Sequence, residues 1–420
     1  MHNSAAIAID SPAMRQAGRE LLSLALMDAR NHTLHWMAQY EQSLEAAMFV
    51  VPRLPELNPP LWELGHVGWF QEWWIGRNLQ RRKGRRCDPH ALRPASIEPR
   101  SDSWWDSTQV PHDSRWALDL PSLGDIKGYL LETLESTLEL LEKTPDQDDA
   151  LYFFRLALFH EDMHGEAFAY MAQTLGLPLR LPMPGPAPAR EALLLPACLW
   201  QLGCADSPGF SFDNERPQAP VQVPEFEIDA QVVNWSQFME FVEDGGYDQP
   251  ELWQPQGWDW LQQRAQAEGR RAPRHVEQIG GPSGAVLQTR FGKSRRMLGA
   301  QPVMHVCWWE ADAWCRWAGR RLPAEVEWEV AAHSAARRGF RWGDVWEWTG
   351  TTFRAYEGAA AGPVFTADPY REYSQPWFGS HKVLRGASFA TRARMKSPKY
   401  RNFYLPHRDD IFSGFRSCAL

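Results

Sequence analysis

Apolar residues recur at helical spacing in several stretches of roughly the first 176 residues, and between Met14 and Val50 only Gly18 interrupts the pattern. Steps of three and four between apolar positions place them on one face of a helix. Proline is tolerated in the first helical turn and glycine often follows the last, so Pro59, Pro60 and Pro121 mark starts and Gly176 marks an end. Helices are therefore predicted at residues 14–50, 59–78, 121–143 and 148–175. Four helices with one long connection predict a four-helix bundle.

The pattern changes after this helical part. Residues 177–196 are rich in proline, which cannot continue a helix, and they predict an inter-domain linker. Beyond it, short apolar runs are broken by Gly, Pro, Asn and Asp, and helical spacing is confined to residues 234–243 and 308–318. The predicted fold class is α+β, with a helical domain at 1–180, a linker at 181–196 and a loop-rich domain at 197–420.

The fourth predicted helix carries two histidines on its apolar face. His160 and His164 are four residues apart, so they project from one side of the helix about a turn apart. They belong to a single stripe with steps of three and four: Phe153, Ala157, His160, His164, Phe168 and Met171. Buried imidazoles need polar partners, because an unsatisfied polar group in a core costs roughly 1–3 kcal/mol. A shared metal ion would satisfy both.

The second predicted helix supplies a third histidine. Trp62, His66, Trp69 and Trp73 step by four, three and four, which places His66 on the inward face. Three histidines from two helices would leave open coordination positions, as a catalytic metal requires. The alternative is ordinary core histidines bonded to the backbone or to Glu63, Glu161 or Asp162. The ligand type leaves Fe, Zn, Cu and Ni open, and His35 is a reserve ligand.

Composition narrows the class of protein. The chain has 420 residues and a net charge of −8, which argues against a nucleic-acid partner. The basic run at residues 77–86 predicts a solvated helix end, with attraction of an anionic substrate as the alternative. We expect no membrane partner, because no apolar run reaches ~18 residues and the N-terminus lacks a secretion signal. Six cysteines without a CxxC pair predict reduced thiols and a cytoplasmic location.

Longer motifs resemble one enzyme family. NPPLWELGHVGWFQEWW and FHEDMHGEAFAY are similar to the DinB-like bundle of the sulfoxide synthases of ergothioneine biosynthesis. FDNERP, AWCRWAGRRLPAEVEWE, YSQPWFG, VLRGASFATR and RNFYLPHRDDIFSGFR resemble their C-terminal domain, which has the fold of formylglycine-generating enzymes and C-type lectins. The resemblance spans nearly the whole chain. It implies Fe(II) on His66, His160 and His164, O2 as co-substrate, and a bond formed between a chalcogen donor and the imidazole carbon of hercynine.

The resemblance also implies substrate-binding residues. The family's Asn-Trp-Asp-x-Pro-x-Arg segment, which helps to hold hercynine and the donor, reads Asn402-Phe403-Tyr404-Leu405-Pro406-His407-Arg408 here. Phe403 keeps an aromatic face for a trimethylammonium group. Met163 stands where the family usually has a glutamine that faces hercynine, and Arg115 is a candidate for binding the donor's carboxylate. Family members use a tyrosine as proton donor, and Tyr370 and Tyr373 are the candidates, with plain packing roles as the alternative.

Tyr404 departs from the family pattern, because it replaces the acid that engages an amino-acid thiol. A neutral, hydroxyl-rich donor suits a phenol better. The resemblance therefore favours the selenoneine synthase subgroup, which joins hercynine to a selenosugar. The alternative is an ergothioneine-type enzyme that joins hercynine to cysteine or γ-glutamylcysteine.

Three other classes fit less well. Formylglycine generation needs paired cysteines after the RGGS-like segment, and residues 385–404 contain none. A pure binding module would not need three inward histidines. A zinc hydrolase would not need the aromatic pocket of the second domain.

Overall fold

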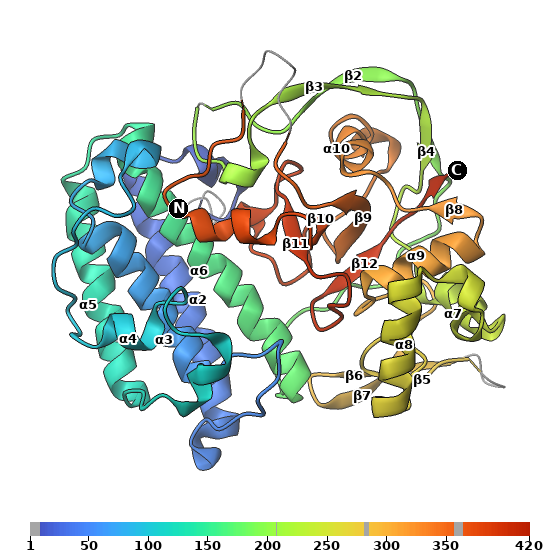
Figure 1. Ribbon diagram of the computed structural model, residues 1–420, viewed down its shortest axis with the longest axis horizontal. Helices are drawn as coiled ribbons and strands as arrows, with labels where there is room; N and C mark the ends of the chain where they lie inside the picture. Colours follow the sequence, from blue (N-terminus) through green and yellow to red (C-terminus); the bar gives the residue numbers. More distant parts are fainter. Residues whose placement is uncertain (1–8, 207, 281–284, 357–363) are drawn as a thin grey trace.

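The computed structural model describes residues 9–206, 208–280, 285–356 and 364–420. Its N-terminal half is helical, as predicted (Figure 1). The four longest helices in the described part of this half are α2 (Arg19–Leu44), α3 (Pro60–Gln71), α5 (Leu123–Glu142) and α6 (Asp148–Leu175). Shorter helical pieces are η1 (Pro12–Gln16), η2 (Glu45–Ala47), the π-helical η3 (Glu72–Gly76), η4 (Arg81–Arg86), α4 (Ser101–Trp105) and η5 (His112–Ala117). Helix α2 packs on α5 and α6, and α3 packs on the same two helices.

The helix ends follow the capping signals in the sequence. The hydroxyl of Ser122 accepts a hydrogen bond from the backbone N–H of Asp125 at the start of α5. Pro60 occupies the first turn of α3, where its missing N–H costs nothing. Gly176 ends α6 in the left-handed region with φ of 68°, which glycine adopts without strain. Gly176 thus fixes the C-terminal end of α6, the helix that carries two of the three histidines.

The C-terminal half is α+β. Its helices are α7 (Trp235–Glu243), α8 (Pro255–Glu268), α9 (Trp308–Trp317) and α10 (Glu325–Ser334). Helices α7 and α9 match the two predicted patches, whereas α8 and α10 were not predicted. Short 3-10 turns also occur: η6 (Asp213–Glu215), η7 (Gly246–Asp248), η8 (Pro250–Leu252), η9 (Ala336–Arg338), η10 (Arg371–Tyr373), η11 (Gln375–Trp377) and η12 (Ala393–Met395).

Small sheets organise this half. One has the order β11 (Asn402–Tyr404), β10 (Lys382–Gly386), β9 (Trp346–Thr352) and β12 (Ser413–Phe415), in which only the β12–β9 pair is parallel. A second has the order β1 (Leu193–Leu195), β4 (Phe226–Ile228), β13 (Cys418–Ala419) and β8 (Arg320–Arg321). The others are β2 (Cys198–Leu202) with β3 (Ala219–Val223), and β5 (Val276–Gln278), β6 (Val286–Arg290) and β7 (Lys293–Met297).

Strand β1 lies inside the segment predicted as linker. Leu193 and Leu195 are buried and pair with β4, so the last residues of the range 181–196 belong to a sheet of the C-terminal half. Proline correctly excluded a helix there, but a run of three leucines is too short to predict a strand. The division of the chain into two domains stays a prediction.

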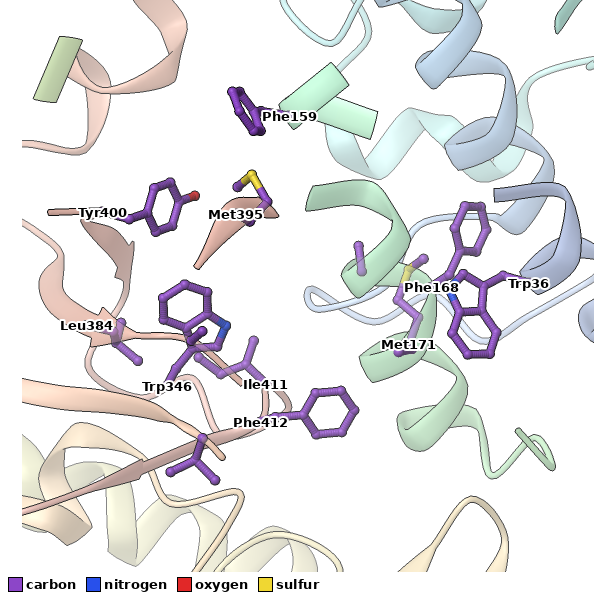
Figure 2. Packing of buried hydrophobic residues seen from close by; sticks show 14 of the residues in the cluster. Trp36, Phe159, Phe168, Met171, Trp346, Leu384, Met395, Tyr400, Ile411 and Phe412 are labelled. Atoms are coloured by element: carbon purple, nitrogen blue, oxygen red, sulfur yellow. The ribbon is translucent and has the colours of Figure 1, made fainter. Parts of the chain in front are cut away.

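Helix α6 joins the two halves. Residues two positions apart on a helix point in nearly opposite directions, and Asp162 and Glu166 alternate with His160 and His164. Asp162 accepts two hydrogen bonds of 2.6 and 2.7 Å from the buried Arg394 of the C-terminal half. One hydrophobic cluster continues through both halves (Figure 2): it includes Trp36, Phe168 and Met171 among the helices, and Trp346, Leu384 and Ile411 around the β9–β10 sheet.

No helix in the described part of the chain is long and apolar enough to cross a membrane. The expectation about a secretion signal concerns the N-terminus, of which residues 1–8 lie outside the described residues.

Candidate metal centre

Three histidines from two helices lie together in the helical half. His66 comes from α3, and His160 and His164 stand one turn apart on α6. One nitrogen of each imidazole lies within 4.8 Å of a nitrogen of each of the other two. His66 and His160 are buried, and His164 is partly buried. The structure thus brings together the three predicted ligands, and no other group of three His, Cys, Asp or Glu in the described ranges is as close.

Hydrogen bonds on the outer side of two rings fix their tautomers. Nδ1 of His66 lies 2.8 Å from the carbonyl oxygen of Trp105, and Nδ1 of His164 lies 2.6 Å from Oε1 of Glu63. A carbonyl and a carboxylate only accept hydrogen bonds, so each Nδ1 carries the proton and each Nε2 presents a lone pair. The Nε2 atoms of His160 and His164 are 3.1 Å apart. Outer-side bonds of this kind are typical of metal-ligating histidines.

The surroundings favour the uncharged form of His66 and of His160. Burial, the neighbouring His164 and other groups lower the pKa of His66 to about 3, and burial with the two other histidines lowers the pKa of His160 well below its usual value. Phe70 stacks on His160 with ring centroids 3.5 Å apart and an interplanar angle of 4°. Because neutral imidazole is the ligand form, this centre is ready for a cation near neutral pH.

The two remaining acids of the predicted alternative face elsewhere. Glu161 pairs with Arg30 at 2.9 Å, and Asp162 pairs with Arg394. Of the acids named in that alternative, only Glu63 bonds to one of the three histidines. His66 and His164 do have hydrogen-bond partners, yet these bonds use Nδ1 and leave Nε2 for a shared ion.

A chain of polar contacts extends outward from His164. Glu63 accepts a 2.7 Å hydrogen bond from the Asn58 side chain, and Asn58 in turn accepts one of 2.7 Å from Arg115. Burial opposes ionisation of Glu63, but the contact with His164 prevails and its pKa is lowered. The guanidinium of Arg115 lies 3.7 Å from the ring centroid of Trp62, and burial lowers its pKa to about 10. Arg115 therefore supports the histidines through Asn58, and its predicted role in binding the donor stays a prediction.

Tyrosines of the C-terminal half border the histidines. The ring of Tyr370 lies 6.4 Å from that of His160 and 5.0 Å from that of Phe70, both edge-on. Tyr373 reaches Tyr400 through a 3.1 Å contact between hydroxyls. Burial raises the pKa of all three phenols, so they stay protonated at neutral pH.

Met163 also belongs to this group, because the hydroxyl of Tyr400 lies 3.3 Å from its sulfur. Tyr400 was missed by sequence reasoning, since no motif marks it.

The segment predicted to bind substrate forms β11 and the turn after it. Phe403 stacks on Phe353 with ring centroids 4.1 Å apart, and its ring is edge-on to Tyr373 at 5.8 Å, which places β11 beside the tyrosines. Asn402 accepts a hydrogen bond from the backbone N–H of Phe403. These contacts bring the predicted hercynine segment to the tyrosine side of the centre.

Tyr404 is the last residue of β11, and Arg408 is the last residue of the segment. Burial raises the pKa of Tyr404 to about 12, so its side chain is a neutral phenol at pH 7. Arg408 lies 4.9 Å from the Tyr404 ring, but Asp410 neutralises it through contacts of 2.5 and 2.7 Å. Tyr404 therefore offers a neutral hydroxyl group to a second substrate, whereas the charge of Arg408 is already paired with Asp410.

His35, the reserve ligand, does not join the cluster. Its Nε2 lies 3.0 Å from the side-chain nitrogen of Gln39 on α2. The outer partners of the cluster were only partly foreseen: Glu63 appeared among possible partners of the histidines, whereas Asn58 has no sequence signal.

A helical half that presents three histidines beside a loop-rich α+β half defines a two-part protein with a candidate metal centre. Residues 179–344 match the family of the sulfatase-modifying factor enzyme 1-like domain. The chain belongs to the hercynine oxygenase family. It is 32% identical over 455 residues to a hercynine oxygenase of Mycolicibacterium smegmatis, covering 95% of this chain and 98% of that protein. A hercynine oxygenase of Mycolicibacterium thermoresistibile is 32% identical over 95% of this chain and 94% of its own.

The C-terminal half has a second group of relatives. A formylglycine-generating enzyme of Streptomyces coelicolor is 32% identical over 197 residues, which are 41% of this chain and 58% of that protein. The match to this domain family begins at residue 179, so it includes the segment predicted as linker.

Proposed function

We propose that this chain is an O2-dependent nonheme iron enzyme that joins the imidazole carbon of hercynine to a chalcogen donor. The observation that carries the proposal is the convergence of three imidazoles, in a chain related along nearly its whole length to hercynine oxygenases. His66, His160 and His164 would hold Fe(II) and leave positions for substrate and O2. Bound Fe(II) would supply the electrons and the coordination sites that O2 chemistry needs.

The protein's own side chains would orient the reactants and move protons. Glu63 is a positioning residue, because it holds the proton of His164 at Nδ1. Tyr370 is the first candidate for the proton donor, since its ring lies nearest to a ligand, His160. Tyr373 is the second candidate, and its hydroxyl is already engaged with Tyr400. Substituting each tyrosine by phenylalanine and comparing product ratios would separate the two.

Hercynine carries a fixed positive charge, and the aromatic residues around β11 suit it. Phe403 and Tyr373 lie edge to face, and an aromatic face attracts a quaternary ammonium group. Phe403→Ala should weaken hercynine binding by about 0.5–2 kcal/mol, with a smaller effect on histidine, which lacks the trimethylammonium group. Calorimetric titration of both ligands measures the difference, and an equal loss for both would contradict a cation–π role.

A sulfur donor, cysteine or γ-glutamylcysteine, is the first candidate for the second substrate. The relatives that cover nearly the whole chain are named for hercynine, and none of those reported above is named for selenium. A selenosugar is the second candidate, and the observation that favours it is Tyr404. This partly buried phenol is neutral and cannot form an ion pair with the ammonium group of an amino-acid thiol, whereas it can both donate to and accept from sugar hydroxyls.

One experiment separates the two donors. The protein is loaded anaerobically with Fe(II), mixed with hercynine, and given γ-glutamylcysteine, cysteine or selenoglucose under O2, with products identified by mass spectrometry. Oxidised conjugates of hercynine with any donor support the reaction class, and no conjugate with any of them would contradict it. The ratio of kcat/KM values between donors then assigns the substrate.

The variant Tyr404→Asp sharpens the assignment. It buries a charge that a neutral donor cannot compensate, so selenosugar coupling should fall by much more than thiol coupling. Tyr404→Phe is the matched control, because it keeps the ring and removes only the hydroxyl. A wild type that prefers γ-glutamylcysteine would exclude the selenosugar.

A further inference from the structure

A large cavity lies between the halves of the molecule, and none of the three histidines lines it. It has a volume of about 1040 Å³, which is the size of a pocket for a small molecule. Its walls are the side of α2 that carries His35 and Gln39, the chain at residues 178–184, and strands β6 and β7. Figure 1 shows β6 and β7 beside the C-terminal end of α6, where Gln173 bonds to the backbone of Thr289 and Phe291.

Arg290, at the end of β6, lines this cavity and lacks a partner for its charge. It is only 7% exposed. Its guanidinium donates to the sulfur of Met304 at 2.8 Å and lies 3.8 Å from the sulfur of Met297, and its Nε has no partner. Thioether sulfur is a weak acceptor. Burial without any opposing charge lowers the pKa of Arg290 to about 9.

The groups around Arg290 supply no negative charge. The nearby imidazoles are His275 and His305, and burial together with neighbouring cations keeps the pKa of both far below the usual value. Glu277, an acid on the same sheet, is exposed and is bonded to Thr289 and Ser294. Buried charges in proteins are normally paired, because an unpaired one is costly. The missing partner of Arg290 is therefore expected to come from outside the chain.

The rest of the lining has the same bias. Besides Arg290, four exposed cations line the rim of the cavity: Arg180, Lys293, Arg295 and Arg296. No Asp or Glu of the described residues lines it. Apolar side chains complete the walls: Leu179, Leu181, Met183, Phe291, Met297 and Leu298. A ligand that matches this surface carries an oxyanion and an apolar body.

We propose that this cavity is a second ligand site, which binds a small organic anion whose phosphate or carboxylate pairs with Arg290. A planar guanidinium forms two parallel hydrogen bonds with either oxyanion. The exposed cations of β7 and Arg180 attract the anion, and the leucine and methionine side chains cover its apolar part.

The test uses the full-length protein with three probes in calorimetric titration: phenyl phosphate, benzoate and inorganic phosphate. The first two differ in the oxyanion, and the third lacks the apolar body. We expect saturable binding of phenyl phosphate or benzoate, tighter than that of inorganic phosphate. The organic probe that binds more tightly then shows whether the site prefers a phosphate or a carboxylate. Arg290→Met should weaken this binding about 10- to 100-fold, as expected for lost charge-assisted hydrogen bonds.

Thermal unfolding supplies a second readout. The bound probe should raise the Tm of the wild type, whereas Arg290→Met should be at least as stable as the wild type without probe and should not respond to it. Arg338→Met removes an exposed arginine outside the cavity and is the matched control. Should Arg290→Met fail to fold, the rim variant Arg180→Gln/Arg296→Gln should still weaken binding severalfold. The absence of saturable binding to the wild type, or equal binding to wild type and cavity variants, would overturn the proposal.

Discussion

Each of the three histidines is held by a different neighbouring residue. Removing any one of them should therefore be enough to abolish metal binding. His66 is bonded to Trp105, His164 to Glu63, and His160 is stacked on Phe70. We expect His66→Ala, His160→Ala and His164→Ala each to abolish stoichiometric iron binding and turnover. Iron per chain and product formation measure this. His333→Ala, at an exposed position on α10, is the control. If one of these variants kept full iron content and activity, the histidine that it lacks would not be a metal ligand.

Glu63 tests the outer support of the centre. Glu63→Gln keeps the shape of the side chain but loses the charge that holds the proton of His164. Loss of such a partner typically costs 10- to 100-fold in metal affinity, and we expect a change of about this size. Glu161→Gln is the matched control, because Glu161 is an equally buried carboxylate whose partner is Arg30. It should lower stability and leave metal affinity unchanged. Equal losses of affinity in both variants would assign Glu63 a structural role only.

Among the residues of the site, the three histidines could be predicted from the sequence better than the residues that hydrogen-bond to them. The spacing of His160 and His164 is a local rule of helix geometry, and the tryptophans around His66 marked its inward face. The partner of His66 is a backbone carbonyl 39 residues away, which leaves no mark in the sequence. The contact of Arg115 with Asn58 depends equally on how a long loop folds back.

Helix α6 is the element on which both halves depend, because it carries two of the three histidines on one side and contacts the C-terminal half with the other. Arg394 and Asp162 are both buried, and removing one partner of a buried pair costs about 3–5 kcal/mol. We expect Asp162→Asn to lower the free energy of unfolding by that amount, measured by denaturant titration.

Glu268→Gln is the control for this prediction. It breaks the partly exposed pairs with Arg264 on α8 and with Arg270, and exposed pairs typically contribute only about 0.2–1 kcal/mol each. An Asp162→Asn variant as stable as Glu268→Gln would contradict the role of α6 as the joint between halves.

The elements were predictable where their signals are local. Proline marked the start of α3, glycine marked the end of α6, and the capping pattern at Asn234 lies at the start of α7. Helix α8 was missed because it is largely polar, with Leu261 and Gly257 as its buried residues. Helix α10 is buried over most of its length, so its sequence shows no contrast between faces.

The arrangement of the whole molecule was predictable only through the family resemblance. Order along the chain indicated a helical half and an α+β half, but the contact of β11 with the tyrosines joins residues far apart in sequence. The cavity beside Arg290 arises from α2, residues 178–184 and the β6–β7 hairpin, and no motif connects these three. Properties that depend on such packing, including buried titratable groups, follow from the structure alone.

Stability against acid is one such property. His305 is fully buried, and burial with nearby cations lowers its pKa, while the pKa of the adjacent His275 falls to about 3. The folded pKa therefore lies below the unfolded value of about 6.5, so the unfolded chain binds protons that the folded chain does not. The stability contributed by neutral His275 and His305 is present above pH 6.5. It is lost as the pH falls below that value, by roughly 1.4 kcal/mol per pH unit for each group.

His305→Asn should reduce by one the number of protons that the unfolded chain binds in excess of the folded chain. Asparagine tolerates the left-handed backbone that His305 adopts, with φ of 63°. Between pH 6 and pH 5 we expect the free energy of unfolding of the wild type to fall more steeply than that of the variant, by roughly 1.4 kcal/mol per pH unit. Denaturant titrations at both pH values measure the two slopes, and His90→Asn, at an exposed position, should keep the slope of the wild type. If His305→Asn keeps it as well, His305 titrates normally in the folded chain, because only a histidine held neutral makes the folded state bind fewer protons than the unfolded one.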